Sequence, residues 1–141
     1  MKILLIDPMG KHVPVKGKPG VSLNLGLACL SSVLIEKGHT ISLFDMQNHF
    51  ENNLSSLCAV LQEHKPDIVG FSIINSQYTN AMNTIRDIRL HTDALILAGG
   101  AEATAMKEKI IEESNNSIDI LMLGEAEETL VETINYLENN N

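Results

Sequence analysis

Five short runs of apolar and β-branched residues recur along the chain, and a stretch with helical spacing of its apolar residues follows each run. Hydrophobicity is nearly continuous within the runs, which is typical of parallel strands that helices cover on both faces. The pattern therefore predicts a central parallel sheet. Its strands are KILLID (2–7), TISLFD (40–45), DIVGFSI (67–73), ALILAGG (94–100) and DILMLG (119–124).

The segments between these runs predict helices with recognisable ends. Ser22 is the expected N-cap of the first helix, and Gly38 is a residue type that commonly follows a helix C-terminus. The second helix ends before Lys65, because Pro66 disfavours the α conformation in the residue that precedes it. The predicted helices are 22–37, 52–64, 77–91, 103–115 and 126–138.

This strand–helix alternation predicts the fold. With right-handed crossovers, the commonest compact arrangement is a flavodoxin-like (Rossmann-like) three-layer α/β sandwich with strand order 2-1-3-4-5. A chain of 141 residues and 15.5 kDa is the size of one domain, so residues 1–141 are expected to fold as a single unit.

Composition narrows the classes of function. A formal net charge of −8 disfavours nucleic-acid binding, which needs cationic surface. No apolar run approaches the roughly 18 residues of a membrane helix, and no signal peptide precedes the first strand, so a cytoplasmic protein is expected. Cys29 and Cys58 are expected to be buried thiols. No histidine is assigned to a metal, and His39, His64 and His91 are expected to be solvated.

Ligands of open α/β sheets lie beyond the carboxyl ends of the strands, near the point where the strand order reverses. The long connection after the first strand, residues 8–21, is expected to be a binding loop. The other strand ends supply small and polar residues. Together the strand ends offer Asp7-Pro8, Ser72-Ile73-Ile74-Asn75, Gly99-Gly100-Ala101-Glu102 and Gly124-Glu125, with Tyr78 just inside the third helix.

Most of these residues have a structural interpretation as well as a functional one. Gly99-Gly100 exposes backbone to a ligand or forms a plain turn. The Ser72 hydroxyl binds a ligand or caps the next turn, and Tyr78 stacks on a ligand or packs on the sheet. Asp7 is more simply the start of a turn.

The acidic residues after the fifth strand have the same ambiguity. Negative charge in the first turn of a helix is favoured by the helix dipole, and this explanation suffices for Glu127 and Glu128.

Several other flavodoxin-like classes are excluded by their motifs. A receiver domain needs an acidic pair, an aspartate and a lysine at three strand ends, where this chain has Asp7-Pro8, Ser72 and Gly124. The flavodoxin phosphate loop, the P-loop and the dinucleotide fingerprint are missing from the sequence. No nucleophile elbow occurs either, so a binding module is favoured over an enzyme.

In combination, four segments resemble the N-terminal cobalamin-binding domain of cobalamin-dependent radical S-adenosylmethionine (radical SAM) enzymes. Residues 23–45, LNLGLACLSSVLIEKGHTISLFD, are similar to the family pattern LGLxYLAxxLxxxGHxVxxxD. The other segments are KPDIVGFSIINSQY (65–78), LILAGGAEAT (95–104) and DILMLGEAEETL (119–130). The resemblance covers nearly the whole chain.

The resemblance implies that cobalamin lies over the strand ends, with its nucleotide tail in the crevice beside the third and fourth strands. It implies neither catalytic residues nor a protein ligand to cobalt, since the D-x-H-x-x-G motif of other cobalamin proteins is absent. The implied cofactor-binding residues are Asp7, Pro8, Ser72, Ile73, Asn75, Tyr78, Gly99, Gly100, Ala101, Thr104, Gly124 and Glu125.

The sequence departs from the family at three points. The family pattern GGPHxT reads Gly99-Gly100-Ala101-Glu102-Ala103-Thr104, and GEGE has Ala126 at its third position. The C-x-x-x-C-x-x-C motif that holds a radical-generating [4Fe-4S] cluster is absent. The chain is thus expected to be the cofactor-holding N-terminal part of a methyltransferase or cyclase-like enzyme, without catalytic activity alone.

In that enzyme, S-adenosylmethionine and the cluster would be held by a radical SAM domain, in cis or in trans. The alternatives are an interaction or regulatory domain that has lost the cofactor, and an enzyme acting alone. The last would need an acid–base pair that the strand ends do not supply.

Overall fold

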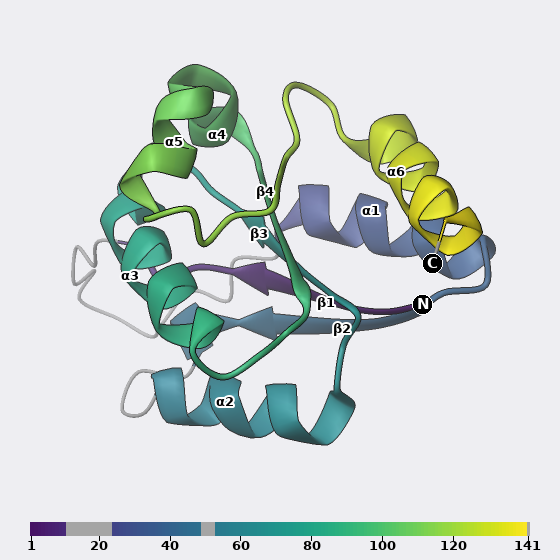
Figure 1. Ribbon diagram of the computed structural model, residues 1–141, viewed down its shortest axis with the longest axis horizontal. Coiled ribbons are helices and arrows are strands. Elements are labelled where there is room, and N and C mark those ends of the chain that lie inside the picture. The colour runs from purple at the N-terminus through teal and green to yellow at the C-terminus, as the bar shows by residue number, and fades with distance from the viewer. Residues whose placement is uncertain (11–23, 49–52, 141) are drawn as a thin grey trace.

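The computed structural model describes residues 1–10, 24–48 and 53–140, and contains a five-stranded, all-parallel sheet (Figure 1). The strand order is β2-β1-β3-β4-β5, which confirms the predicted flavodoxin-like topology. The strands are β1 (Lys2–Asp7), β2 (Thr40–Asp45), β3 (Ile68–Ser72), β4 (Leu95–Gly99) and β5 (Ile120–Leu121).

Helices cover both faces of the sheet (Figure 1). Helices α1 and α6 lie on one face, while α2 and α3 lie on the other. The helices are α1 (Leu25–Glu36), α2 (Asn53–His64), α3 (Tyr78–Arg89), α4 (Ala101–Met106), α5 (Glu108–Glu113) and α6 (Glu127–Asn139), with short 3-10 turns at Met46–Asn48 and Asn75–Gln77.

Each face of the sheet has its own apolar core. On the α1/α6 face, Leu27 and Leu34 of α1 pack with Leu130 and Ile134 of α6. On the other face, a larger cluster joins α2, α3, α4 and α5 to the sheet. Because both faces of the central strands are buried, their apolar runs are continuous, and this pattern was sufficient to locate the strands in the sequence.

Three predicted element boundaries were wrong. The N-cap of α1 is Asn24, whose side chain accepts a hydrogen bond from the Leu27 amide at 3.1 Å, and Ser22 lies outside the described residues. The expected helix 103–115 is two short helices, because Lys107 has a positive φ of 49° between them. The last strand ends at Leu121, three residues before the end of the expected run.

Three expectations about burial were also wrong. Cys29 is exposed on α1, and Cys58 of α2 is only partly buried. His39, between α1 and β2, is buried, and its Nδ1 lies 3.3 Å from the amino group of Met1. No helix in the described residues has the length and apolar character needed to cross a membrane.

Candidate functional site

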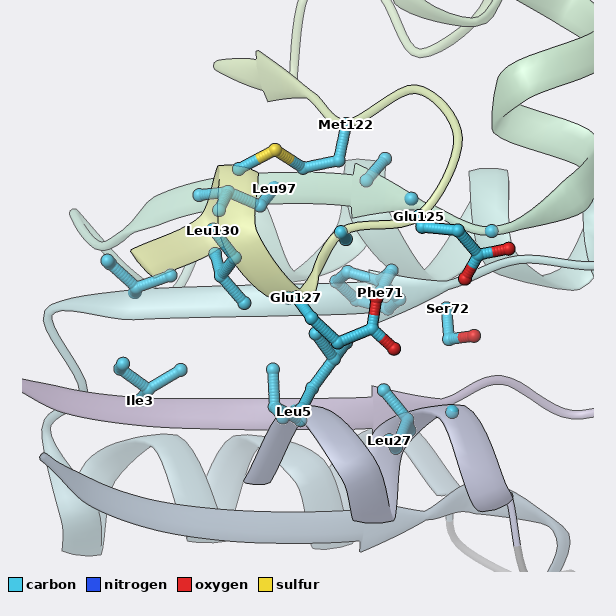
Figure 2. Close-up of a pocket in the computed structure, with 18 of the residues that line it drawn as sticks. Ile3, Leu5, Leu27, Phe71, Ser72, Leu97, Met122, Glu125, Glu127 and Leu130 are labelled. Carbon is cyan, nitrogen blue, oxygen red and sulfur yellow. The ribbon is translucent and has the colours of Figure 1, made fainter. Parts of the chain in front are cut away.

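A pocket of about 140 Å³ opens between α1 and α6 on one face of the sheet (Figure 2). It extends from the buried middle of the strands to their carboxyl ends. The residues around it come from three strands, β1, β3 and β4, from both helices, from the turn after β4 and from the loop that leads into α6. They are Ile3, Leu5, Gly26, Leu27, Leu30, Ile68, Gly70, Phe71, Ser72, Leu97, Ala98, Gly99, Gly100, Met122, Gly124, Glu125, Ala126, Glu127 and Leu130.

The inner part of the pocket is apolar. Leu5 and Leu97 rise from the sheet, Leu27 faces them from α1, and Leu130 covers them from α6. These four side chains belong to the smaller core and are nearly inaccessible to solvent. Gly70 leaves room above the sheet for the Leu5 side chain, since a Cβ at position 70 would lie 2.9 Å from Cδ2 of Leu5.

Polar side chains gather at the mouth of the pocket. Figure 2 shows the oxygen atoms of Ser72 and Glu125 at one end of the pocket and the Glu127 carboxylate nearer its middle. Ser72 ends β3, Glu125 lies in the loop before α6, and Glu127 is the first residue of α6. Within 1–10, 24–48 and 53–140, none of these three side chains forms a hydrogen bond or an ion pair, so their oxygen atoms are available to a ligand.

The loops after β3 and β4 pack directly on each other. The Ile73 amide donates to the Gly99 carbonyl at 2.8 Å, and the Glu102 amide donates to the Ile73 carbonyl at 3.1 Å. Gly100 has φ +98°, and a Cβ on it would lie only 2.7 Å from the Ile73 carbonyl oxygen. This close approach of two loops explains why glycine is needed at position 100, without any ligand.

Thr104 joins the β4 loop to the β5 loop. Its Oγ1 donates to the Gly100 carbonyl at 3.1 Å and accepts from the Gly124 amide at 2.9 Å. Gly124 itself has φ +74°, with open space where a side chain would be. The threonine thus holds the turn that forms one side of the pocket mouth.

A buried polar cluster connects the ends of β1 and β3. The Nε2 of Gln77 donates to Oδ1 of Asp7 at 2.7 Å and to the Pro8 carbonyl at 2.8 Å. The Ile74 amide in turn donates to Oε1 of Gln77 at 3.2 Å, and Gln47 donates to the second Asp7 oxygen at 3.4 Å. Asp7 is therefore engaged by protein groups, and the loops on either side are fixed.

Tyr78 and Asn75 are directed away from the pocket. The Tyr78 hydroxyl donates to Glu113 of α5, and Asn75 donates to the Glu102 carboxylate at 3.3 Å. Burial, followed by the Glu113 hydrogen bond, raises the pKa of Tyr78 from 10.0 to about 12. The same hydrogen bond lowers the pKa of Glu113. The phenol is thus kept protonated as a link between α3 and α5.

The pocket brings together only part of the set that the sequence predicts. Ser72, Gly99, Gly100, Gly124 and Glu125 line it. The remaining predicted residues lie beside or behind it, and they are Asp7, Pro8, Ile73, Asn75, Tyr78, Ala101 and Thr104. The loop 11–21, which was expected to contribute to binding, lies outside the described residues.

Sequence reasoning missed two functional candidates and most of the apolar wall. Glu127 lines the pocket, although the helix dipole alone had seemed to explain it. Gln77 was not singled out, although it is buried and holds two loops. Leu27, Leu30 and Leu130 lie within predicted helices, but no sequence signal distinguishes an apolar helix residue that borders a cavity from one that does not.

In the part of the chain that the structure describes, no group of three or more histidine, cysteine, aspartate or glutamate residues has the arrangement to hold a metal ion.

Comparison with known proteins gives a consistent result. The family model described as B12 binding domain matches residues 18–134. The fold is similar to that of the radical S-adenosylmethionine methyltransferase TsrM from Kitasatospora setae, solved with cobalamin and an iron–sulfur cluster bound (TM-score 0.84, 21% identity). It is also similar to OxsB, a cobalamin-dependent S-adenosylmethionine radical enzyme solved with aqua-cobalamin (TM-score 0.79, 23% identity). A search of curated proteins found no match.

These similarities cover very different shares of the proteins compared. Each match includes 99% of this chain, but only 25% of the TsrM chain and 19% of the OxsB chain. At this level of identity the two structures establish the shared fold.

Proposed function

This chain belongs to the B12 binding domain family, and from that premise we propose that it holds cobalamin over the carboxyl ends of its strands, as the cofactor-binding part of a radical SAM enzyme. When bound, cobalamin supplies a cobalt centre that carries a methyl group or exchanges electrons. The part of the chain described here contributes binding and orientation, and it offers the cobalt no histidine from a D-x-H-x-x-G motif.

The observation that carries this proposal is the pocket between α1 and α6. Ligand sites commonly have volumes of roughly 300–1,000 Å³, whereas this pocket has about 140 Å³ and is open at the strand ends. It therefore suits one projecting part of a large ligand. The nucleotide tail of cobalamin, which ends in a flat aromatic base, is such a part, while the bulky corrin ring would remain outside.

The chemistry of the pocket fits this division of the cofactor. The apolar inner walls favour burial of an aromatic ring, and the oxygen-bearing side chains Ser72, Glu125 and Glu127 would be available to hydroxyl and amide groups of the linker between base and corrin. The Ser72 hydroxyl can both donate and accept a hydrogen bond, and the Glu125 and Glu127 carboxylates accept from hydroxyl or amide groups. Gly124 leaves the rim open.

The proposal also extends to the enzyme of which this chain would be a part. TsrM and OxsB are both several times longer than this chain. A radical SAM domain, in the same polypeptide or in a partner, would supply the iron–sulfur cluster and S-adenosylmethionine. The substrate would be determined there.

The direct test is to mix the purified chain with hydroxocobalamin, remove free cofactor by gel filtration, and record the visible spectrum of the protein peak. Co-elution of a cobalamin spectrum with the base detached from cobalt is the expected outcome. A colourless protein peak at micromolar concentration would contradict the proposal and would favour an interaction domain that has lost the cofactor.

A variant of the pocket sharpens this test. Gly26 lies on the exposed side of α1 at the pocket, and a Cβ on it would meet only Oδ1 of Asn24, at 3.4 Å. Gly26→Leu adds bulk at the mouth without removing a core side chain, and it also raises helix propensity. We expect at least about tenfold weaker cobalamin binding, equivalent to about 1.4 kcal/mol, without a lower melting temperature.

The matched control is Ser32→Leu. Ser32 is exposed on the same helix, and its hydroxyl bonds only to the Ala28 carbonyl of the preceding turn. It does not line the pocket. Equal losses of binding in the two variants would argue against the α1/α6 pocket as the site.

A further inference from the structure

The inner part of the α1/α6 pocket lacks free hydrogen-bonding groups in the sheet beneath it. Gly70 is paired with Leu5 of β1 on one side and with Leu97 of β4 on the other, and Leu97 is paired in turn with Ile120 of β5. The main-chain amides and carbonyls of the pocket floor are thus engaged in the parallel ladder. A ligand atom that reaches the floor meets side-chain carbon only.

The helical walls have the same character. Leu27 and Leu30 face the pocket from α1, and Leu130 faces it from the first turns of α6. The Leu27 amide donates to the Asn24 side chain and the Leu130 amide donates to the Ala126 carbonyl, so neither is open to a ligand. Met122 completes the wall with a thioether, which is a weak acceptor.

The oxygen-bearing side chains of the pocket lie toward its open half. They are Ser72, Glu125 and Glu127, and Figure 2 shows none of their oxygen atoms beside Ile3 at the opposite end. The pocket therefore has a polar end and an apolar end. A ligand group that fits must have its polar atoms near the linker and an apolar far edge.

We infer that the pocket selects among corrinoids by the polarity of the base at the end of the nucleotide tail, in favour of dimethylbenzimidazole and against adenine. This inference rests on the proposed function. Dimethylbenzimidazole has an apolar far edge with two methyl groups. Adenine has an exocyclic amine and several ring nitrogens, which would lose water and find no partner at the pocket floor.

The test compares three corrinoids on the unmodified 141-residue chain by spectroscopic titration. They are cobalamin, the corrinoid with adenine in place of dimethylbenzimidazole, and cobinamide, which lacks the nucleotide tail. We expect the adenine form to bind at least about tenfold more weakly than cobalamin, which is the scale of one buried polar group left unpaired. Cobinamide should also bind more weakly than cobalamin.

The outcomes separate the inference from the proposed function. Equal affinity for cobalamin and the adenine form, or tighter binding of the adenine form, would overturn the inference while cofactor binding stands. Equal affinity for cobalamin and cobinamide would likewise overturn it, since the base would then have no place in the pocket. Failure of all three to bind would overturn the proposed function together with the inference.

A pair of variants tests the pocket wall itself. Leu130 is 5% exposed and lines the pocket, so Leu130→Gln places an amide beside the base. We expect this change to reduce the cobalamin-to-adenine preference by about threefold or more, the value of one added hydrogen bond, whereas Leu130→Met leaves the preference unchanged. An unchanged preference in a folded Leu130→Gln protein would contradict the inference, and the corrinoid series on the unmodified chain decides it if that variant does not fold.

Discussion

The buried side chain of Gln77 forms hydrogen bonds with the loops after β1 and β3. It donates to the Asp7 carboxylate at 2.7 Å and to the Pro8 carbonyl at 2.8 Å, and accepts from the Ile74 amide at 3.2 Å. Because one amide group fixes the geometry of both loops, its loss leaves one oxygen of the buried Asp7 carboxylate and two backbone groups without this partner.

We therefore predict that Gln77→Leu lowers the free energy of unfolding by about 1–3 kcal/mol, as measured by urea denaturation. Gln47 provides the matched control, since it also donates to Asp7 but over 3.4 Å and at a partly buried position. Gln47→Leu should cost less than about 1 kcal/mol. Equal losses would show that the bonds of Gln77 to the two loops contribute nothing.

Substitution of Gly38 tests backbone strain alone, whereas substitution of Gly100 adds a steric clash. Both have positive φ, +88° and +98°, but a Cβ at Gly38 meets nothing within 4 Å, whereas one at Gly100 meets the Ile73 backbone. Gly38→Ala should cost about 1–2 kcal/mol from its conformation alone. Gly100→Ala should cost about 1–3 kcal/mol more, and similar melting temperatures for the two variants would contradict this.

At the residue scale, the sequence predicted some pocket residues and not others for a physical reason. Ser72 and Gly124 were found because they lie at or near the ends of hydrophobic runs, although β5 itself ends at Leu121. Tyr78 is also near a strand end, but its direction depends on Glu113, which is 35 residues away in sequence. No local pattern contains that contact.

At the element scale, the hydrogen bond from Tyr78 to Glu113 ties α3 to α5. Burial and then this bond raise the pKa of Tyr78 to about 12. Because the folded pKa lies above the ordinary value of 10.0, the stabilisation associated with the protonated phenol is complete below pH 10.0 and is lost as the pH rises toward about 12.

Absorbance titration checks this assignment, because the chain has two tyrosines and no tryptophan. The difference between the unmodified protein and Tyr78→Phe should report a midpoint near pH 12, as the raised pKa requires. Glu113→Gln should lower that midpoint, since it removes both the carboxylate acceptor and its negative charge. A midpoint of 10.0 in the unmodified protein would contradict the contact.

Element boundaries show where local patterns are sufficient. The bounds of β1 and β2 coincide with the predicted runs, because an apolar strand with polar neighbours has clear ends. The break at Lys107 was not predicted, since lysine is a good helix former and its φ of 49° is a property of the folded chain. Asn115 and Asn116, also with positive φ, end the second of these helices.

At the scale of the whole molecule, strand order followed from general rules of chain connection, and the structure confirms it. The pocket did not follow from those rules. Its walls are on α1 and α6, which are separated by most of the chain and meet only because both cover the same face of the sheet. The packing of these two distant helices against each other is the part of the site that could not be predicted from the sequence.

The pocket is also a hollow within the smaller of the two cores, since Leu5, Leu27, Leu97 and Leu130 belong to both. If the base of the cofactor fills it, the ligand completes the interior of the protein. Chains made when corrinoid is scarce would then open more often and be degraded sooner than loaded chains. The cell would thus hold as much of this protein as it has cofactor to load, without any dedicated regulator.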